Sequence, residues 1–167
     1  MADLVTHLCI GWLPCILFAP RWSTAVAIGT VLPDLTGRVP QMLLAKVPEL
    51  LPERILWCLD VAHQPLAQAL LVVVIGQGFR EESRRRATLG MGIGVCLHFA
   101  LDILQDHHGN GYYLFFPFSL ERFELGWIGS EATTTYALPL LGVTLLALAV
   151  RVGWERGNGR GSNKSVR

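Results

Sequence analysis

Four long stretches of the chain carry no Asp, Glu, Lys or Arg, and they constrain the fold more than any other feature. They cover residues 4–20, 61–79, 87–101 and 132–150. A helix needs about 20 apolar residues to cross a bilayer, so runs of this length are typical of membrane helices. Only 16% of the 167 residues are charged, which excludes a disordered chain and a nucleic-acid binder driven by bulk positive charge. We expect an all-α fold: a small polytopic membrane helical bundle with about four membrane-embedded helices.

The N-terminal part of the chain contains a fifth, shorter apolar run. Residues 22–33 reach only about 18 Å as a helix, which is too short to cross a bilayer alone. Pro20 and Arg21 separate this run from the one at 4–20. We therefore expect the two runs to form a re-entrant N-terminal hairpin.

The distribution of basic residues predicts the orientation in the membrane. Segment 80–86 holds four arginines and the tail from residue 151 holds five basic residues, whereas 105–131 holds four acidic residues against one arginine. The positive-inside rule then places 80–86 and the C-terminal tail in the cytoplasm and 105–131 outside. We expect a membrane-embedded domain over 1–152 and a disordered polar, basic tail over 153–167, where Gly, Ser and Asn are frequent.

Three glycines at alternate positions, Gly90, Gly92 and Gly94, lie in the run at 87–101. Small residues favour close helix packing in a bilayer, so these positions predict a close helix contact and offer a surface for an oligomer. Membrane lipids are the other expected partner, and no nucleic-acid partner is expected.

Five ionisable residues interrupt the apolar pattern, and a residue of this kind inside a membrane protein usually serves function. They are His7, Asp34, His63, His98 and Asp102. His98 and Asp102 are four residues apart, so they share one face of a helix. With the hairpin and orientation above, all five reach the outer side of the membrane.

Three imidazoles and two carboxylates are suitable ligands for one or two Zn²⁺ ions, or for Mn²⁺ or Fe²⁺. In a hydrolase, Asp34 or Asp102 would also accept a proton, and we name both as catalytic residues. Taken singly, the same residues are also consistent with a buried hydrogen-bonded pair, an interfacial histidine and a helix cap.

Two further positions are possible accessories to this site. His107 and His108 follow Asp106 and precede Gly-Asn-Gly, a sequence that is also typical of a solvated turn. The other accessory is Gln68, five residues after His63.

The order of these short motifs resembles a known family. The motifs are Thr6-His7 with Gly11, Gly29 followed by Leu32-Pro33-Asp34, His63 before an apolar helix, His98-x-x-x-Asp102, Pro117-Phe118 and Leu125-Gly126-Trp127. Over about residues 5–150 the chain resembles the bacterial inner-membrane metal-dependent hydrolases, the YdjM-like and related groups. Many YdjM-like members have a His-Arg-Gly-x-x-His motif, and Gln68 stands where its second histidine would fall.

The resemblance implies an inner-membrane hydrolase with a divalent metal, acting on an ester or phosphoester, possibly of a lipid. The ligand order also has a more remote likeness to the zinc-dependent phospholipase C and P1 nuclease group, whose zinc cluster hydrolyses phosphoesters. Two alternatives remain open from the sequence. One is a non-catalytic membrane protein whose His/Asp cluster serves helix packing, partner docking or ion binding. The other is a transporter, which the short chain and the lack of an inverted repeat make less attractive.

Overall fold

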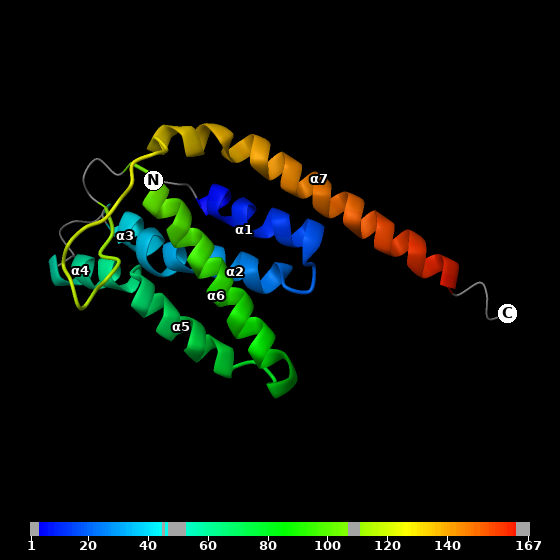
Figure 1. Cartoon of the computed structure of the whole chain (residues 1–167), viewed down its shortest axis with the longest axis horizontal. Helices are drawn as coiled ribbons and strands as arrows, with labels where there is room; N and C mark the ends of the chain where they lie inside the picture. Colours follow the sequence, from blue (N-terminus) through cyan, green and yellow to red (C-terminus); the bar gives the residue numbers. More distant parts are fainter. Residues whose placement is uncertain (1–3, 45, 47–52, 107–110, 163–167) are drawn as a thin grey trace.

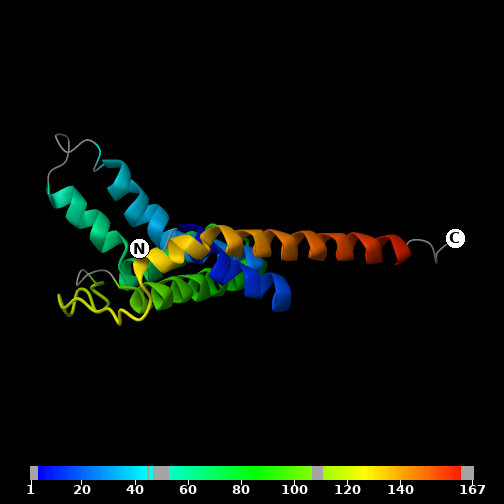
Figure 2. The ribbon, with the colours of Figure 1, turned by 90° about the horizontal axis from the view of Figure 1, so that it is seen from above.

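The computed structural model describes residues 4–44, 46, 53–106 and 111–162, and these form an all-α bundle (Figure 1). The elements in chain order are α1 (Leu4–Phe18), α2 (Ser23–Pro33), the π-helix η1 (Asp34–Arg38), α3 (Val39–Leu44), α4 (Glu53–Ala62), α5 (Pro65–Gln77), α6 (Glu81–Leu104) and α7 (Ser130–Ser162). Seen from above, α3 and α4 project from the bundle at one end, and α7 runs past the other helices at the opposite end (Figure 2).

Two helices are long and apolar enough to cross a membrane, namely α6 and the part of α7 over Thr134–Arg156. A third span requires α4 and α5 together, because Arg54–Ala62 and Pro65–Gln77 qualify as a pair bent by 69°. At about 1.5 Å per residue, the 15 residues of α1 reach only about 22 Å, which is shorter than the apolar core of a bilayer. The described residues therefore contain two candidate membrane spans, or three if the bent pair is one span, and α1 is a shorter apolar helix beside them.

The N-terminal hairpin expected from the sequence is present. α1 and α2 pack against each other and are joined by a turn over residues 19–22. Arg151 on α7 donates a hydrogen bond to the carbonyl oxygen of Ile16, one of the last residues of α1. Because the last carbonyls of a helix have no partner within the helix, this contact fixes the end of α1 against α7.

Glycines bring α2 and α6 together at the centre of the molecule. A Cβ atom added to Gly90 would lie 2.6 Å from the Cβ atom of Ala25, and one added to Gly94 would lie 2.7 Å from the backbone nitrogen of Thr30. The predicted close helix contact is therefore made within the chain by these two glycines. Gly92, in contrast, has open space around it and is free for other contacts.

The apolar run at 61–79 is divided between the end of α4 and the whole of α5. It breaks at His63 and Gln64, between α4 and α5. Pro65 takes the first position of α5, and Gln64 before it is extended, with φ −74° and ψ 155°. Proline disfavours the helical conformation at the residue that precedes it, and the extended Gln64 ends the run at this point.

Helices include most of segment 80–86 and continue past residue 152. The three arginines of 84–86 belong to the first turns of α6. α7 continues to Ser162, ten residues past the expected end of the membrane domain at 152. An ion pair between Arg151 and Glu155, with N and O 3.0 Å apart, supports the helix across this boundary.

The loop between α6 and α7 folds back onto the end of α6. The backbone N–H groups of Leu125 and Ile128 donate to the carbonyls of Ile103 and Leu104, at 2.7 and 2.9 Å. Tyr112 and Phe123 pair across the loop in an antiparallel bridge. These contacts satisfy the last carbonyls of α6 and hold the loop over the end of the bundle that contains the site.

Candidate metal centre

The structure brings all five ionisable residues singled out in the sequence together at one end of the bundle. His7 comes from the first turn of α1, Asp34 begins η1, His63 lies at the break between α4 and α5, and His98 and Asp102 lie near the end of α6. In Figure 1 this is the end where α3, α4 and the loop after α6 gather. Each of the five is less than one-tenth exposed.

Asp102 contacts all three histidines of this cluster. Its Oδ1 atom lies 3.2 Å from His7 Nε2, and its Oδ2 atom lies 3.1 Å from His98 Nε2 and 3.7 Å from His63 Nε2. Asp34 Oδ1 lies 3.5 Å from His63 Nε2 and 4.0 Å from His98 Nε2. Since every histidine contact uses Nε2, the ligand atoms face a common centre.

The backbone of α2 sets the protonation of His98. The Nδ1 atom of His98 lies 2.8 Å from the carbonyl oxygen of Thr30, with the side chain fully buried. A carbonyl only accepts hydrogen bonds, so Nδ1 carries the hydrogen, and in the neutral ring Nε2 carries a lone pair directed at the cluster. Metal-binding histidines usually have a partner of this kind on the other ring nitrogen.

Hydrogen bonds account for only part of the close contacts among the five residues, although His98 Nε2 lies 3.2 Å from His63 Nε2. Both ring nitrogens of His7, the Nδ1 atom of His63 and the Oδ2 atom of Asp102 are buried and have no aligned hydrogen-bond partner in the described part of the chain. Two buried carboxylates also need compensating positive charge. One divalent cation bound among the five residues would balance the charge of both carboxylates.

The separations of the ligand atoms fit a metal ion. Ligands about 2.0–2.1 Å from a tetrahedral Zn²⁺ lie about 3.3–3.4 Å from one another. The contacts from Asp34 and Asp102 to the histidines are 3.1–4.0 Å. Two trios have ligand atoms within 4.8 Å of one another: His7, Asp34 and His98, and His63, His98 and Asp102. Both trios include His98. An ion bound to His98 Nε2 could therefore take its other two ligands from the first trio or from the second.

Gln68, the expected accessory residue, makes hydrogen bonds to residues next to the metal ligands. Its side chain is fully buried, and Nε2 donates to Thr36 Oγ1 at 2.8 Å and to the carbonyl of Ala62 at 2.6 Å. It therefore ties η1 to the break that carries His63. Gly37 permits this approach, because a Cβ atom there would lie 2.7 Å from the Cβ of His63. The other accessories, His107 and His108, lie outside the described residues.

Aromatic rings enclose the cluster. The ring of His7 stacks on His98 with centroids 3.9 Å apart, and Tyr112 stacks on His63 at 5.3 Å. The edge of Phe99 meets both His63 and His98, at 5.5 and 5.4 Å. Burial raises the pKa of the Tyr112 hydroxyl, and the Asp102 carboxylate raises it further, so this ring faces the site as a neutral phenol.

Sequence reasoning missed Thr30, Arg38 and Tyr112. Thr30 contributes only its backbone carbonyl, which no side-chain pattern reveals. Arg38 is four residues after Asp34, but it lies in a π-helix rather than an α-helix. The guanidinium carbon of Arg38 lies 5.2 Å from the centroid of the Tyr112 ring. A π-helical turn is frequently found at a functional site, although the sequence gives no clear signal for one.

These features define a class: an all-α, membrane-type bundle with a buried His/Asp cluster at one end that is able to hold a metal ion. Residues 1–162 match the YdjM inner membrane protein family, and the chain belongs to it. No curated protein and no solved structure matches the chain. The resemblance to the YdjM-like group is thus confirmed over nearly the whole sequence, and this family is one of inner membrane proteins.

Proposed function

We propose that the protein is a metal-dependent hydrolase that cleaves an ester or phosphoester at the outer face of the inner membrane. The observation that carries this proposal is the buried cluster itself. It combines two carboxylates and three imidazoles whose close contacts are explained only in part by hydrogen bonds. A divalent ion such as Zn²⁺, Mn²⁺ or Fe²⁺, when bound, acts as a Lewis acid and activates water near neutral pH.

We assign two roles to the residues of the cluster, metal ligand and proton acceptor. His98 is oriented by the Thr30 carbonyl, and Asp102 contacts three histidines, so these two are the central ligands. Asp34 is the more accessible carboxylate, with its side chain 10% exposed against 3% for Asp102. We assign Asp34 as the residue that accepts a proton from the attacking water, with His7 and His63 completing the set of ligands.

The arrangement of helices supports an outward-facing site. His98 and Asp102 lie near the C-terminal end of α6, whereas Arg84, Arg85 and Arg86 lie near its N-terminal end. If the arginines are cytoplasmic, as the positive-inside rule predicts, the cluster lies at the outer side. α7 begins near the site and runs away from it (Figure 1), which agrees with a proposed C-terminal tail on the cytoplasmic side.

The test is hydrolysis by the full chain in a non-ionic detergent. The protein is stripped of metal, resupplied with Zn²⁺ or Mn²⁺, and assayed on chromogenic phosphomonoester, phosphodiester and carboxylic ester substrates. We expect activity that depends on added metal and is lost in Asp34→Asn. Glu82→Gln, which removes an exposed carboxylate on α6, is the matched control and should retain activity. Equal turnover by wild type and Asp34→Asn would contradict the proposal.

A further inference from the structure

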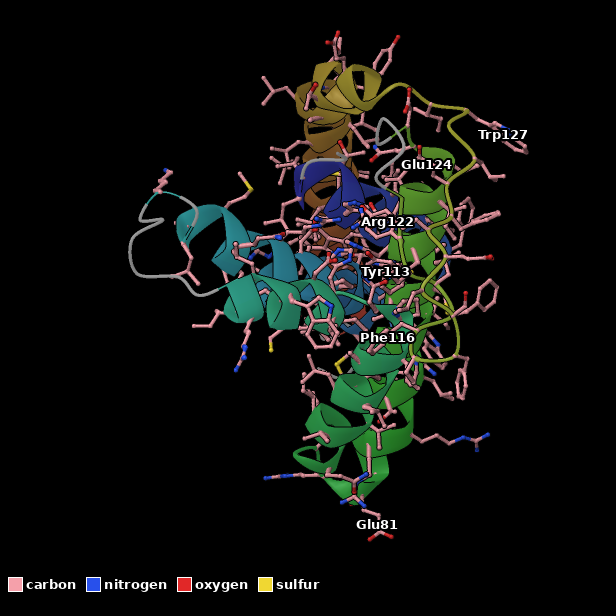
Figure 3. The ribbon with its side chains drawn as sticks, turned by 90° about the vertical axis from the view of Figure 1, so that its left-hand side faces the viewer. Glu81, Tyr113, Phe116, Arg122, Glu124 and Trp127 are labelled. Atoms are coloured by element: carbon pink, nitrogen blue, oxygen red, sulfur yellow. The ribbon has the colours of Figure 1, made fainter. Side chains whose placement is uncertain are left out.

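A polar pocket of about 290 Å³ lies beside the metal-ligand cluster, and two arginines line it. Arg38 enters from η1, and Arg122 enters from the loop between α6 and α7. Trp57 and Asp60 of α4 form part of the wall. Figure 3 shows Arg122 and Tyr113 on this loop, at the end of the molecule far from Glu81.

One aromatic ring separates this pocket from the cluster. Arg38 lies over one ring, that of Tyr112, and the same ring stacks on His63. Arg38 and Asp34 are also the two ends of η1. A group bound by Arg38 would therefore lie near the metal ligands without displacing them. Its distance from the ester bond at the metal site would be fixed.

The two guanidinium groups are not neutralised within the described part of the chain. Arg38 has a long hydrogen bond of 3.4 Å from Nη1 to the side-chain oxygen of Gln41, and its buried Nε has no partner among the described residues. Arg122 uses Nε to donate to the Tyr113 hydroxyl at 3.0 Å. Neither Arg38 nor Arg122 takes part in an ion pair within the described part of the chain. Among the residues that line the pocket, Asp60 is the one acidic residue.

Arginine is well suited to bind phosphate, because its planar guanidinium presents paired N–H donors to two oxygens. We propose that this pocket, the Arg38–Arg122 pocket, binds a phosphate group of the substrate next to the ester that is cleaved. The inference rests on the proposed function and narrows it to phosphate-bearing substrates.

The phosphate could belong to a lipid or to a soluble compound, and a neighbouring groove bears on this choice. An apolar groove of about 1020 Å³ runs between α5 and α6, and its lining includes Pro65 and Phe99. Phe99 also touches His63 and His98 in the cluster. An acyl chain in this groove would end close to the metal ligands.

The pocket is tested by isothermal titration of the full chain in a non-ionic detergent with EDTA present, so that bound metal does not contribute to anion binding. The probes are inorganic phosphate and dioctanoyl phosphatidic acid, with uncharged dioctanoylglycerol as the reference. We expect both phosphate probes to bind the wild type. Arg38→Gln and Arg122→Gln should each weaken binding by about tenfold or more, because each removes charge-assisted hydrogen bonds.

Two further variants control for charge and for folding. Arg85→Gln removes an exposed arginine from the start of α6 and should bind phosphate like the wild type. Arg38→Lys keeps the charge and should retain part of the affinity. Phosphatidic acid binding more tightly than inorganic phosphate would assign the pocket to a lipid headgroup, and equal binding would assign it to soluble phosphates.

Two results would overturn the inference: unchanged affinity in both Arg38→Gln and Arg122→Gln, or an equal loss in Arg85→Gln. Metal-dependent hydrolysis is measured in parallel on an uncharged ester. Hydrolysis that persists while phosphate binding is absent refutes only the pocket, and phosphate binding without metal-dependent hydrolysis refutes only the proposed enzyme.

Discussion

Replacing Gly94 with alanine should separate α2 from α6 and thereby weaken metal binding at a distance. An added Cβ atom would lie 2.7 Å from the Thr30 backbone nitrogen and 2.8 Å from the Gly29 carbonyl carbon, and closest of all to the Val26 carbonyl oxygen. Ordinary contacts between carbon atoms begin at about 3.5 Å, so the two helices must move apart by about 0.7–1 Å. Overpacking of this kind destabilises a protein by about 1–3 kcal/mol.

The same movement reaches the metal ligands through Thr30. Its carbonyl oxygen lies 2.8 Å from His98 Nδ1, and a shift of this size takes the pair to about 3.5 Å or beyond, outside a good hydrogen bond. His98 would then lose the contact that fixes its tautomer. Loss of such a partner typically lowers metal affinity by about 10–100-fold.

The assay is competition for Zn²⁺ with a chromophoric chelator, alongside thermal unfolding in detergent. Gly92→Ala is a matched control on the same helix, because a Cβ atom there meets nothing within 4 Å. Alanine also favours a helix over glycine by up to about 1 kcal/mol, so Gly92→Ala should keep wild-type affinity with equal or higher stability. Wild-type Zn²⁺ affinity in Gly94→Ala would refute the argument that the α2 carbonyl orients His98.

Three more predictions follow from the same contacts. Asp34→Asn should retain metal and lose hydrolysis, whereas Asp102→Asn should lose most of the metal. Elemental analysis and turnover, measured on both variants, distinguish the two effects. Equal metal loss in both would contradict the assignment of Asp34 as proton acceptor and Asp102 as metal ligand. Removal of metal by EDTA should lower the unfolding temperature, and Zn²⁺ at a hundred times its Kd should restore about 2.7 kcal/mol. Arg151→Met should destabilise the protein by about 1–3 kcal/mol, because the Ile16 carbonyl loses a charged donor, while exposed Arg156→Met should have little effect on chemical unfolding.

The sequence was sufficient to predict most of what brings the cluster together. The pattern of charge-free runs predicts helices, and the interruption at Pro20 and Arg21 predicts the N-terminal hairpin that carries His7 and Asp34 to one end. The spacing of His98 and Asp102 predicts that they share a face of α6. Each of these predictions depends on local periodicity or on a single break, which a sequence displays directly.

The parts that the sequence did not predict depend on backbone geometry. Hydropathy treats 61–79 as one run, although Pro65 forces a break and a 69° bend at the position of His63. The Thr30 carbonyl and the π-helical placement of Arg38 arise from tertiary packing, which has no counterpart in residue type or spacing.

The metal content of the purified protein tests the central claim most directly. The full chain is prepared in mild detergent without chelators and without a histidine tag, and elemental analysis is run on wild type, on His98→Asn with Asp102→Asn, and on the Glu82→Gln control. We expect near-stoichiometric divalent metal in the wild type and the control, and little in the double variant. A wild type that holds no metal even after resupply, and whose stability resupply does not change, would contradict this expectation and identify the five residues as a hydrogen-bonded core.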